Sequence, residues 1–347
     1  MSYSNLFVSS IANSNISKSN IASLQKSLNQ VTQEVSSGKK YDIAASLGSK
    51  TPTLVGLKNS VTEMEGYQSS INTVSNRLSV MQNSLTNIIS SVSDYLITAK
   101  TATNDEVSEE FIQGVSQNIL EQTTQFLNVD ISGRKLFSGK DTSTKPMEYN
   151  FNLANDALND AATLKGAPLE VGDIAGLVSD LNDMFNDTHA DTTKHYTGTF
   201  FKADTSTGNV TTRIDENTNL EYGVAADEQA FRDLIQGMHM LANVSNNSAN
   251  LTESAYNEYV SQAVQKLESG LKDVTQIAAE LGLKENTVEK TKLRHQNTID
   301  TINSQIAAFE NIDPAEASVR LNNISAQLEV TYLITSKINN LSLVNYL

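Results

Sequence analysis

The sequence contains no cysteine and no tryptophan, and it has only four prolines. Without cysteine the chain can form neither a disulfide framework nor a thiolate nucleophile nor a cysteine-type zinc site. No apolar run approaches the roughly 18 residues that a membrane-spanning helix needs. The first ten residues also lack the basic and apolar regions of a cleavable signal peptide. We therefore expect no membrane insertion, and a chain that leaves the cell, if it does, without a cleaved signal.

Basic residues are scarce: 25 Lys and Arg face 40 Asp and Glu, for a net charge of −15. Binding to nucleic acid is disfavoured, because phosphate neutralisation needs a basic face. The acidic excess is concentrated in residues 101–228, which carry 8 basic and 22 acidic groups. We expect this middle segment to face solvent, and the nearly neutral ends to pack against other helices.

Motifs of catalysis are also missing. The sequence has no Gly-x-Ser-x-Gly, no His-Glu-x-x-His and no dinucleotide fingerprint. The stretch from Gly133 to Lys140 is not a phosphate loop, because five residues separate its glycines and Asp141 stands where Ser or Thr is needed. A group of carboxylate and imidazole side chains has no standard metal spacing and is interpreted as a solvated loop: Asp187, His189, Asp191 and His195. We predict no enzyme, no catalytic residue, no cofactor and no metal.

What the sequence does contain is apolar residues at alternating steps of three and four, which places them on one face of a helix. The pattern covers residues 21–35, 54–92, 112–129, 256–281, 299–309 and 317–341. Ser37-Gly38 is typical of a helix stop, and Asp313-Pro314 of a helix start. We predict a mainly α fold in which the N- and C-terminal segments form a long, heptad-patterned helical rod.

The middle of the chain has a different pattern, with more Gly and Asp and with stretches in which apolar and polar residues alternate. Residues 173–187 predict a short helix, and residues 196–202 and 210–214 predict a β-hairpin across 206–209. We interpret this segment as a small α+β domain inserted into the rod. The expected division is 1–50 (N-terminal assembly helix), 51–132 (rod), 133–226 (inserted surface domain), 227–312 (rod) and 313–347 (C-terminal assembly helix).

The polar faces of the N-terminal helices carry few charges. Residues 1–100 contain 22 Ser and 10 Asn but only 13 charged residues, whereas a solvent-facing coiled coil normally carries Glu and Lys beside its seam. Small uncharged side chains let identical helices lie side by side without repulsion, and an isolated helix of about 20 such residues is marginal in water. We therefore predict ends that fold on assembly. A cytosolic helical bundle is the plainer alternative. The predicted packing residues are Ile21, Leu24, Leu28, Val31, Val35, Leu321, Ile324, Leu328, Ile338 and Leu341.

Several stretches resemble the flagellin superfamily, and most closely its hook–filament junction branch. The resemblance covers about residues 1–139 and 210–347. Its motifs are Ser36-Ser37-Gly38-Lys39-Lys40, the stretch 131–139, Arg213-Ile214-Asp215 with Tyr222-Gly223-Val224, the stretch 313–317, and the last seven residues, 341–347.

This resemblance implies an extracellular structural subunit of the bacterial flagellum. It implies unfolded export through the flagellar type III apparatus, and a role as the adaptor between the hook and the filament. The implied partners are copies of the chain itself, hook-associated protein 1, flagellin and a cytosolic export chaperone. Residues 341–347 favour the junction branch over filament flagellin, which stays an alternative. A further alternative is that the middle segment is a ligand- or glycan-binding domain on a helical stalk.

Overall fold

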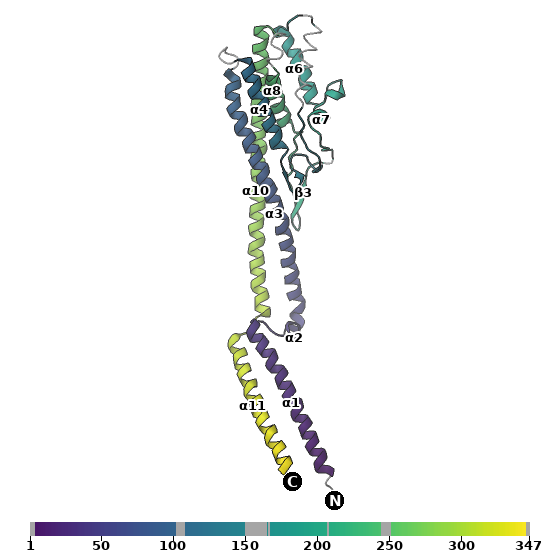
Figure 1. The fold of residues 1–347 in the computed structure, drawn as a ribbon, viewed down its shortest axis with the longest axis vertical. Helices are drawn as coiled ribbons and strands as arrows, with labels where there is room; N and C mark the ends of the chain where they lie inside the picture. Colours follow the sequence, from purple (N-terminus) through teal and green to yellow (C-terminus); the bar gives the residue numbers. More distant parts are fainter. Residues whose placement is uncertain are drawn as a thin grey trace. The chain divides into compact units, whose positions relative to one another are not determined.

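The computed structural model describes residues 4–101, 108–149, 165, 167–206, 208–243 and 251–344, with side chains at the far ends of the terminal helices left out. Long helices dominate it, and the described residues contain two small antiparallel hairpins (Figure 1). The predicted mainly α class, with a small β-containing middle, is confirmed. The helices are α1 (Ser4–Ser37), α2 (Ile43–Leu47), α3 (Thr51–Thr101), α4 (Glu109–Leu127), α6 (Val171–Phe185), α7 (Tyr196–Thr199), α8 (Gln229–Ala242), α10 (Glu253–Glu310) and α11 (Pro314–Val344). Short 3-10 helices cover Gly48–Lys50 and Thr192–Lys194, and the strands are β1 (Asp130–Ile131), β2 (Arg134–Lys135), β3 (Thr211–Asp215) and β4 (Thr218–Glu221).

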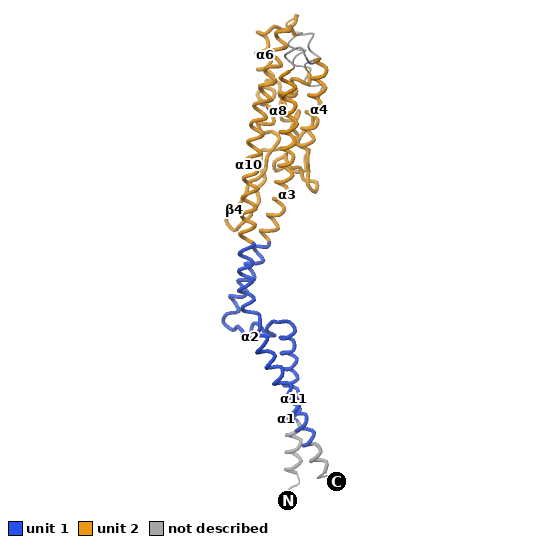
Figure 2. Tube along the Cα trace, turned by 90° about the vertical axis from the view of Figure 1, so that its left-hand side faces the viewer, with its two compact units in different colours: residues 1–65, 296–347 blue, residues 66–295 orange. Residues whose placement is uncertain are grey.

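The chain divides into two compact units (Figure 2). The central unit is residues 66–295, and the terminal unit is residues 1–65 together with 296–347. The division falls inside the two longest helices, α3 and α10, so each of them contributes to both units. The five-part division expected from the sequence stays a prediction.

The central unit has one continuous hydrophobic core. The α3 stripe that runs from Ile71 to Val92 in steps of three and four is fully buried in it, as the spacing predicts. Helix α6 and the segment around Phe200 belong to the same core as α3, α8 and α10. The middle of the chain therefore shares the helical core. An aromatic cluster fills one part of it: Tyr149, Phe185, Tyr196, Phe200 and His239.

Helix α8 approaches α10 unusually closely. A Cβ added at Gly237 would lie 2.8 Å from the carbonyl oxygen of Ala263, and one added at Gly270 would lie 2.5 Å from the amide nitrogen of Leu234. Only glycine fits at these two contacts. The two helices thus pack backbone to backbone in the middle of the core.

The predicted helix at 173–187 is confirmed by α6, which ends two residues earlier at Phe185. The stretches 256–281 and 299–309, expected as separate stripes, belong to the single helix α10.

The predicted β-hairpin was wrong in its pairing. Strand β3 pairs with β4, which follows it through a two-residue turn, and not with residues 196–202. Phe200 and Phe201 are both fully buried, whereas successive side chains of a half-buried strand point to opposite faces. The segment labelled α7 is instead a kinked turn, in which Thr197 and Gly198 have non-helical backbone angles and Gly198 has a φ of 91°.

None of the helices in the described part of the chain is long and apolar enough to span a membrane.

Candidate functional site: the terminal helix pair

Helices α1 and α11 lie side by side and run antiparallel within the terminal unit (Figure 1). Two polar contacts fix their alignment. The Gln25 amide donates a hydrogen bond of 2.8 Å to the Tyr332 hydroxyl, and Arg320 forms an ion pair of 3.2 Å with Glu34. Both contacts join residues about 300 positions apart, so the two ends of the chain meet.

The predicted packing residues of α1 are buried to different degrees. Val31 is buried, and Ile21, Leu24 and Leu28 are half-buried. Val35 remains 38 % exposed. A two-helix seam covers only one side of each apolar residue, which explains why most of these side chains keep contact with solvent.

On α11 the seam begins at Ala317, which is fully buried, and continues through Leu321, Ile324 and Leu328, which are half-buried. Ile338 is 41 % exposed, and the side chain of Leu341 lies outside the described part of the chain. The role of these residues in assembly stays a prediction. Within the pair alone, Val35 and Ile338 are not covered.

The seam becomes polar beyond Leu328. The next positions at helical spacing are Thr331 and Thr335, and both hydroxyls donate to carbonyls of the preceding turn of α11, at 2.7 and 2.8 Å. These threonines contribute little apolar surface to the contact with α1. Between Leu328 and Ile338 the seam therefore buries little apolar surface against α1.

A second apolar face lies on the opposite side of α11. Val319, Val330, Leu333 and Ile334 are each more than half exposed. Three of them share a stripe with Ala326, because residues 319, 326, 330 and 333 follow each other in steps of seven, four and three. This face is not among the packing residues predicted from the sequence, although the same spacing is visible there. Only one apolar stripe was predicted for each helix, with the other positions expected to face solvent.

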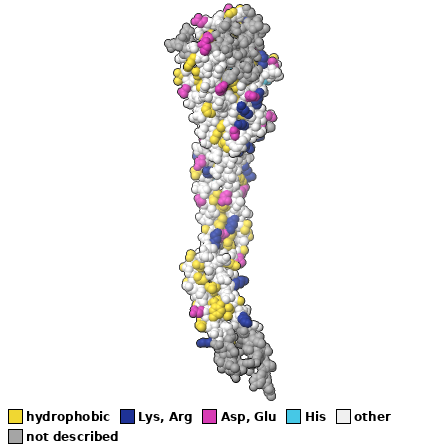
Figure 3. Space-filling model, viewed as in Figure 1, with side chains coloured by type: hydrophobic (Ala, Val, Ile, Leu, Met, Phe, Trp, Pro, Cys, Tyr) yellow, Lys and Arg dark blue, Asp and Glu magenta, His cyan; other side chains and the backbone are white. Residues whose placement is uncertain are grey.

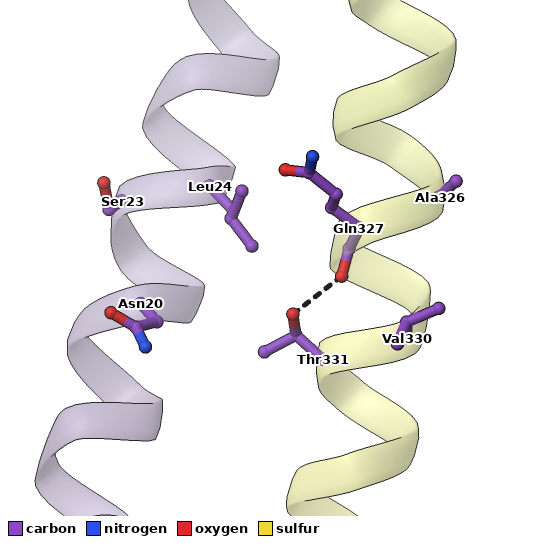
Figure 4. A pocket seen from close by; sticks show the side chains of 7 residues that line it. All are labelled: Asn20, Ser23, Leu24, Ala326, Gln327, Val330 and Thr331. Atoms are coloured by element: carbon purple, nitrogen blue, oxygen red, sulfur yellow. Dashed lines mark hydrogen bonds between the residues drawn. The ribbon is translucent and has the colours of Figure 1, made fainter.

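An open groove of about 620 Å³ runs between the two helices beside this face. Leu24 points across it from α1, while Ala326 and Val330 lie on the far side of α11 (Figure 4). The other lining residues are Asn20, Ser23, Gln327 and Thr331. They are uncharged, so a neutral helix can enter the groove without desolvating an ion.

Apolar side chains also gather on the visible surface of the terminal unit, next to the atoms that are not described (Figure 3). A contiguous apolar area on a surface marks a contact site more often than a scattered leucine does. The terminal helix pair is therefore the candidate functional site.

The carboxylates and histidines near residue 190 have structural partners. Asp187 forms an ion pair of 2.7 Å with Arg232, and His189 lies 3.1 Å from Asp180. Asp191 caps the following 3-10 helix, accepting from the Thr193 amide at 3.0 Å. These contacts account for the loop as part of the fold.

Two family descriptions match the chain. The bacterial flagellin N-terminal helical region matches residues 8–142, and the bacterial flagellin C-terminal helical region matches residues 264–347. The chain belongs to the flagellin family. The resemblance found in the sequence is thereby confirmed, and this flagellin-family chain is a structural protein of the bacterial flagellum. Both helices of the terminal pair lie almost wholly within the matched regions.

Two solved structures are similar to this chain, and the first of them shares its fold. A protein of Vibrio parahaemolyticus assigned as a flagellar hook-associated protein aligns over 76 % of this chain and 99 % of its own, at 12 % identity and a TM-score of 0.51. FlgL of Bacillus cereus aligns over 72 % of this chain and 97 % of its own, at 15 % identity and a TM-score of 0.47. No curated sequence matches this flagellin-family chain significantly.

Proposed function

We propose that this chain is the hook–filament junction protein, hook-associated protein 3, which joins the hook to the flagellin filament through contacts with hook-associated protein 1 and flagellin. The observation that carries the proposal is the second apolar face of α11, which the subunit leaves uncovered beside an uncharged groove. The fold shared with the Vibrio hook-associated protein supports it, as do residues 341–347.

Assembly is favoured because the free subunit leaves apolar side chains of α11 exposed to solvent. Complete burial of a Val, Leu or Ile side chain stabilises a contact by roughly 1.5–3 kcal/mol. Val319, Val330 and Leu333 have more than half of that surface still to bury. A helix of an adjacent copy that docks on this face would bury all three together, in the manner of a helix in a groove.

The same surface explains the proposed route to the outside. An uncovered apolar helix face promotes aggregation in the cytosol, so we expect an export chaperone to cover α11 before secretion. We expect export through the flagellar type III apparatus, a route that needs no cleaved signal. The subunit then acts in the extracellular flagellum, in a ring of copies of itself.

Electron microscopy of a deletion strain tests the proposed role. Loss of a junction protein leaves complete hooks, and flagellin accumulates in the medium because no acceptor holds it. If the chain is filament flagellin instead, deletion removes or shortens the filament and no flagellin is shed.

A pair of leucine variants tests the surface. Leu333→Asp changes a side chain that is exposed in the free subunit, so the subunit should fold but should not restore filament attachment in the deletion strain. Leu283→Asp is the matched control, since Leu283 is exposed on α10 in the central unit. Leu328→Asp, inside the seam, should block assembly as well and leave the central unit folded. Normal attachment with Leu333→Asp would refute the assignment of this face.

A further inference from the structure

The turn of the β3–β4 hairpin lies against both long helices of the central unit (Figure 1). Strand β3 ends at Asp215, and β4 begins after a turn of two residues. The side chains that hold this turn are Tyr67 of α3 and Arg294 and His295 of α10. The central unit begins at residue 66 and ends at residue 295, so these contacts lie at the point where both helices enter it.

His295 joins the hairpin to α3. Its side chain is only 5 % exposed, and its Nε2 donates a hydrogen bond of 3.0 Å to the carbonyl oxygen of Ile214. Ile214 is fully buried, and a buried carbonyl that loses its donor is costly to the fold. The imidazole ring also stacks on the Tyr67 ring, with 5.8 Å between the ring centroids and 26° between the planes. One side chain of α10 therefore contacts both the hairpin and the other long helix.

Two arginines reinforce this contact, one from the hairpin and one from α10. The Arg213 guanidinium lies 5.4 Å from the centroid of the Tyr67 ring, a cation–π arrangement. Its Nε donates to the Asp215 carbonyl at 3.2 Å, which ties it to the turn. Arg294 forms an ion pair with the Asp215 carboxylate, but its side chain is more than half exposed, so this pair contributes little. The buried ring of His295 is the main contact.

The burial of the two long helices changes at this point. On α3, Val74 is fully buried, whereas Met64 is only half-buried. On α10, Val288 is buried, whereas Ile302 is half-buried. Helix stretches that bury few apolar side chains open more easily than those of a core. We therefore expect the first part of α3 and the last part of α10 to fray in the free subunit.

We propose that Tyr67, His295 and the turn of the β3–β4 hairpin form a latch that stops this fraying from entering the core of the central unit. Opening of α3 beyond Tyr67, or of α10 before His295, requires the His295 ring to leave a contact with the other helix or with the hairpin. Such a latch suits a chain whose ends are predicted to fold on assembly, because its core must stay closed while the helix ends that lead to it are open. The inference concerns the free subunit and does not depend on which flagellar structure it joins.

Hydrogen exchange of the purified full-length chain, read by mass spectrometry on overlapping peptides, tests the latch. In the wild type we expect slow exchange in residues 67–78 of α3 and 284–295 of α10, and faster exchange in residues 51–65 and 296–310. His295→Leu removes the hydrogen bond and the ring contact but keeps an apolar side chain at this buried position. It should raise exchange about tenfold in residues 67–78 and 284–295. Exchange in α4 and α8 should stay unchanged, which shows that the variant is folded.

Two further variants separate the latch from a general loss of stability. Tyr67→Leu removes the partner ring on α3, so it should raise exchange in residues 284–295 although the substitution lies on the other helix. Leu293→Ala is the matched control, because Leu293 is exposed two residues before His295, and its exchange should equal that of the wild type.

Three results would overturn the proposal. In the first, the wild type exchanges equally on both sides of the latch. In the second, His295→Leu or Tyr67→Leu leaves residues 284–295 as protected as before, or raises exchange in α8 by the same factor. In the third, Leu293→Ala raises exchange as much as His295→Leu does.

Discussion

Helices of the central and terminal units have a similar spacing of apolar residues, but the two units bury these residues to different degrees. In the central unit the heptad residues of α3 are fully buried, and large aromatic side chains fill the space between helices. In the terminal unit the seam residues of α1 are mostly half-buried, and α11 carries a second apolar face in solvent. The same periodicity thus produces a finished core in one unit and an open contact surface in the other.

The difference in burial arises from the number of helices that pack around each helix. In the central unit α8 packs against both α4 and α6 and has almost no exposed residue. The described part of α1 packs mainly against one helix, α11. A helix with one neighbour can bury only a narrow stripe. The terminal pair therefore has a large share of its possible stability still to gain from contact with another molecule.

The largest predicted effect compares two leucines. Leu85→Ala, in the core of the central unit, should lower the free energy of unfolding by about 2–5 kcal/mol, because it removes fully buried apolar volume. Leu24→Ala, in the half-buried seam of α1, should cost about 1 kcal/mol. Urea denaturation of both variants measures the two values. Equal losses would contradict the proposed difference between the units.

A pair of glycine variants tests the same difference in packing between the two units. Gly237→Ala should destabilise the protein by about 1–3 kcal/mol, because its Cβ would meet the α10 backbone. Gly56→Ala, in the part of α3 that belongs to the terminal unit, has open space around its Cβ and should stabilise the helix by about 0.5–1 kcal/mol. Thermal unfolding should move in opposite directions for the two variants. A stabilising Gly237→Ala would show that α8 and α10 pack less closely than described.

The third effect depends on pH and belongs to the central unit. Burial lowers the pKa of His239 to about 3, and its Nδ1 lies 2.7 Å from the Tyr149 hydroxyl. The folded protein keeps this ring neutral, whereas the unfolded chain takes up a proton near pH 6.5. Stability contributed by the neutral ring is therefore present above pH 6.5 and is lost as the pH falls toward 3.

Between pH 7.5 and pH 5.5 this linkage should cost about 1.4 kcal/mol. His239→Phe keeps an aromatic ring in the cluster and removes the titration, so its stability should fall less over the same interval. Guanidinium denaturation of the two proteins at both pH values measures the difference. Equal losses in the two proteins would mean that His239 is not the group responsible.

Much of the fold could be predicted because its helices are long and strongly periodic. The stripe from Ile71 to Val92, the stop at Gly38 and the start at Asp313 all follow from local spacing and capping. The β-hairpin could not be predicted in this way. The positions of Phe200 and Phe201 are set by the core in which they are buried, and not by an alternation of apolar and polar residues along the chain. The contact of Lys39 with Glu310 joins residues 271 positions apart, and no local pattern predicts such a pairing.

The candidate site was predicted only in part. Leu24, Leu28 and Val31 stand out by their spacing. The structure places Leu24 beside α11 in the groove and buries Val31, and the role of all three in assembly stays a prediction. The second face of α11 shares its helix with the first, so a search for one amphipathic stripe passes over it. Apolar residues on two faces of one helix indicate two contacts, and Val319 and Leu333 mark the one that the subunit leaves open.

We propose that contact with neighbouring molecules in the flagellum completes the terminal pair. Hydrogen exchange of the subunit in solution, compared with that of the subunit within isolated flagella, tests this proposal. We expect amides of α1 and α11 to exchange much faster than those of α8 in the free subunit and to become strongly protected in the flagellum, while α8 stays unchanged. Terminal helices that are equally protected in both states would contradict it.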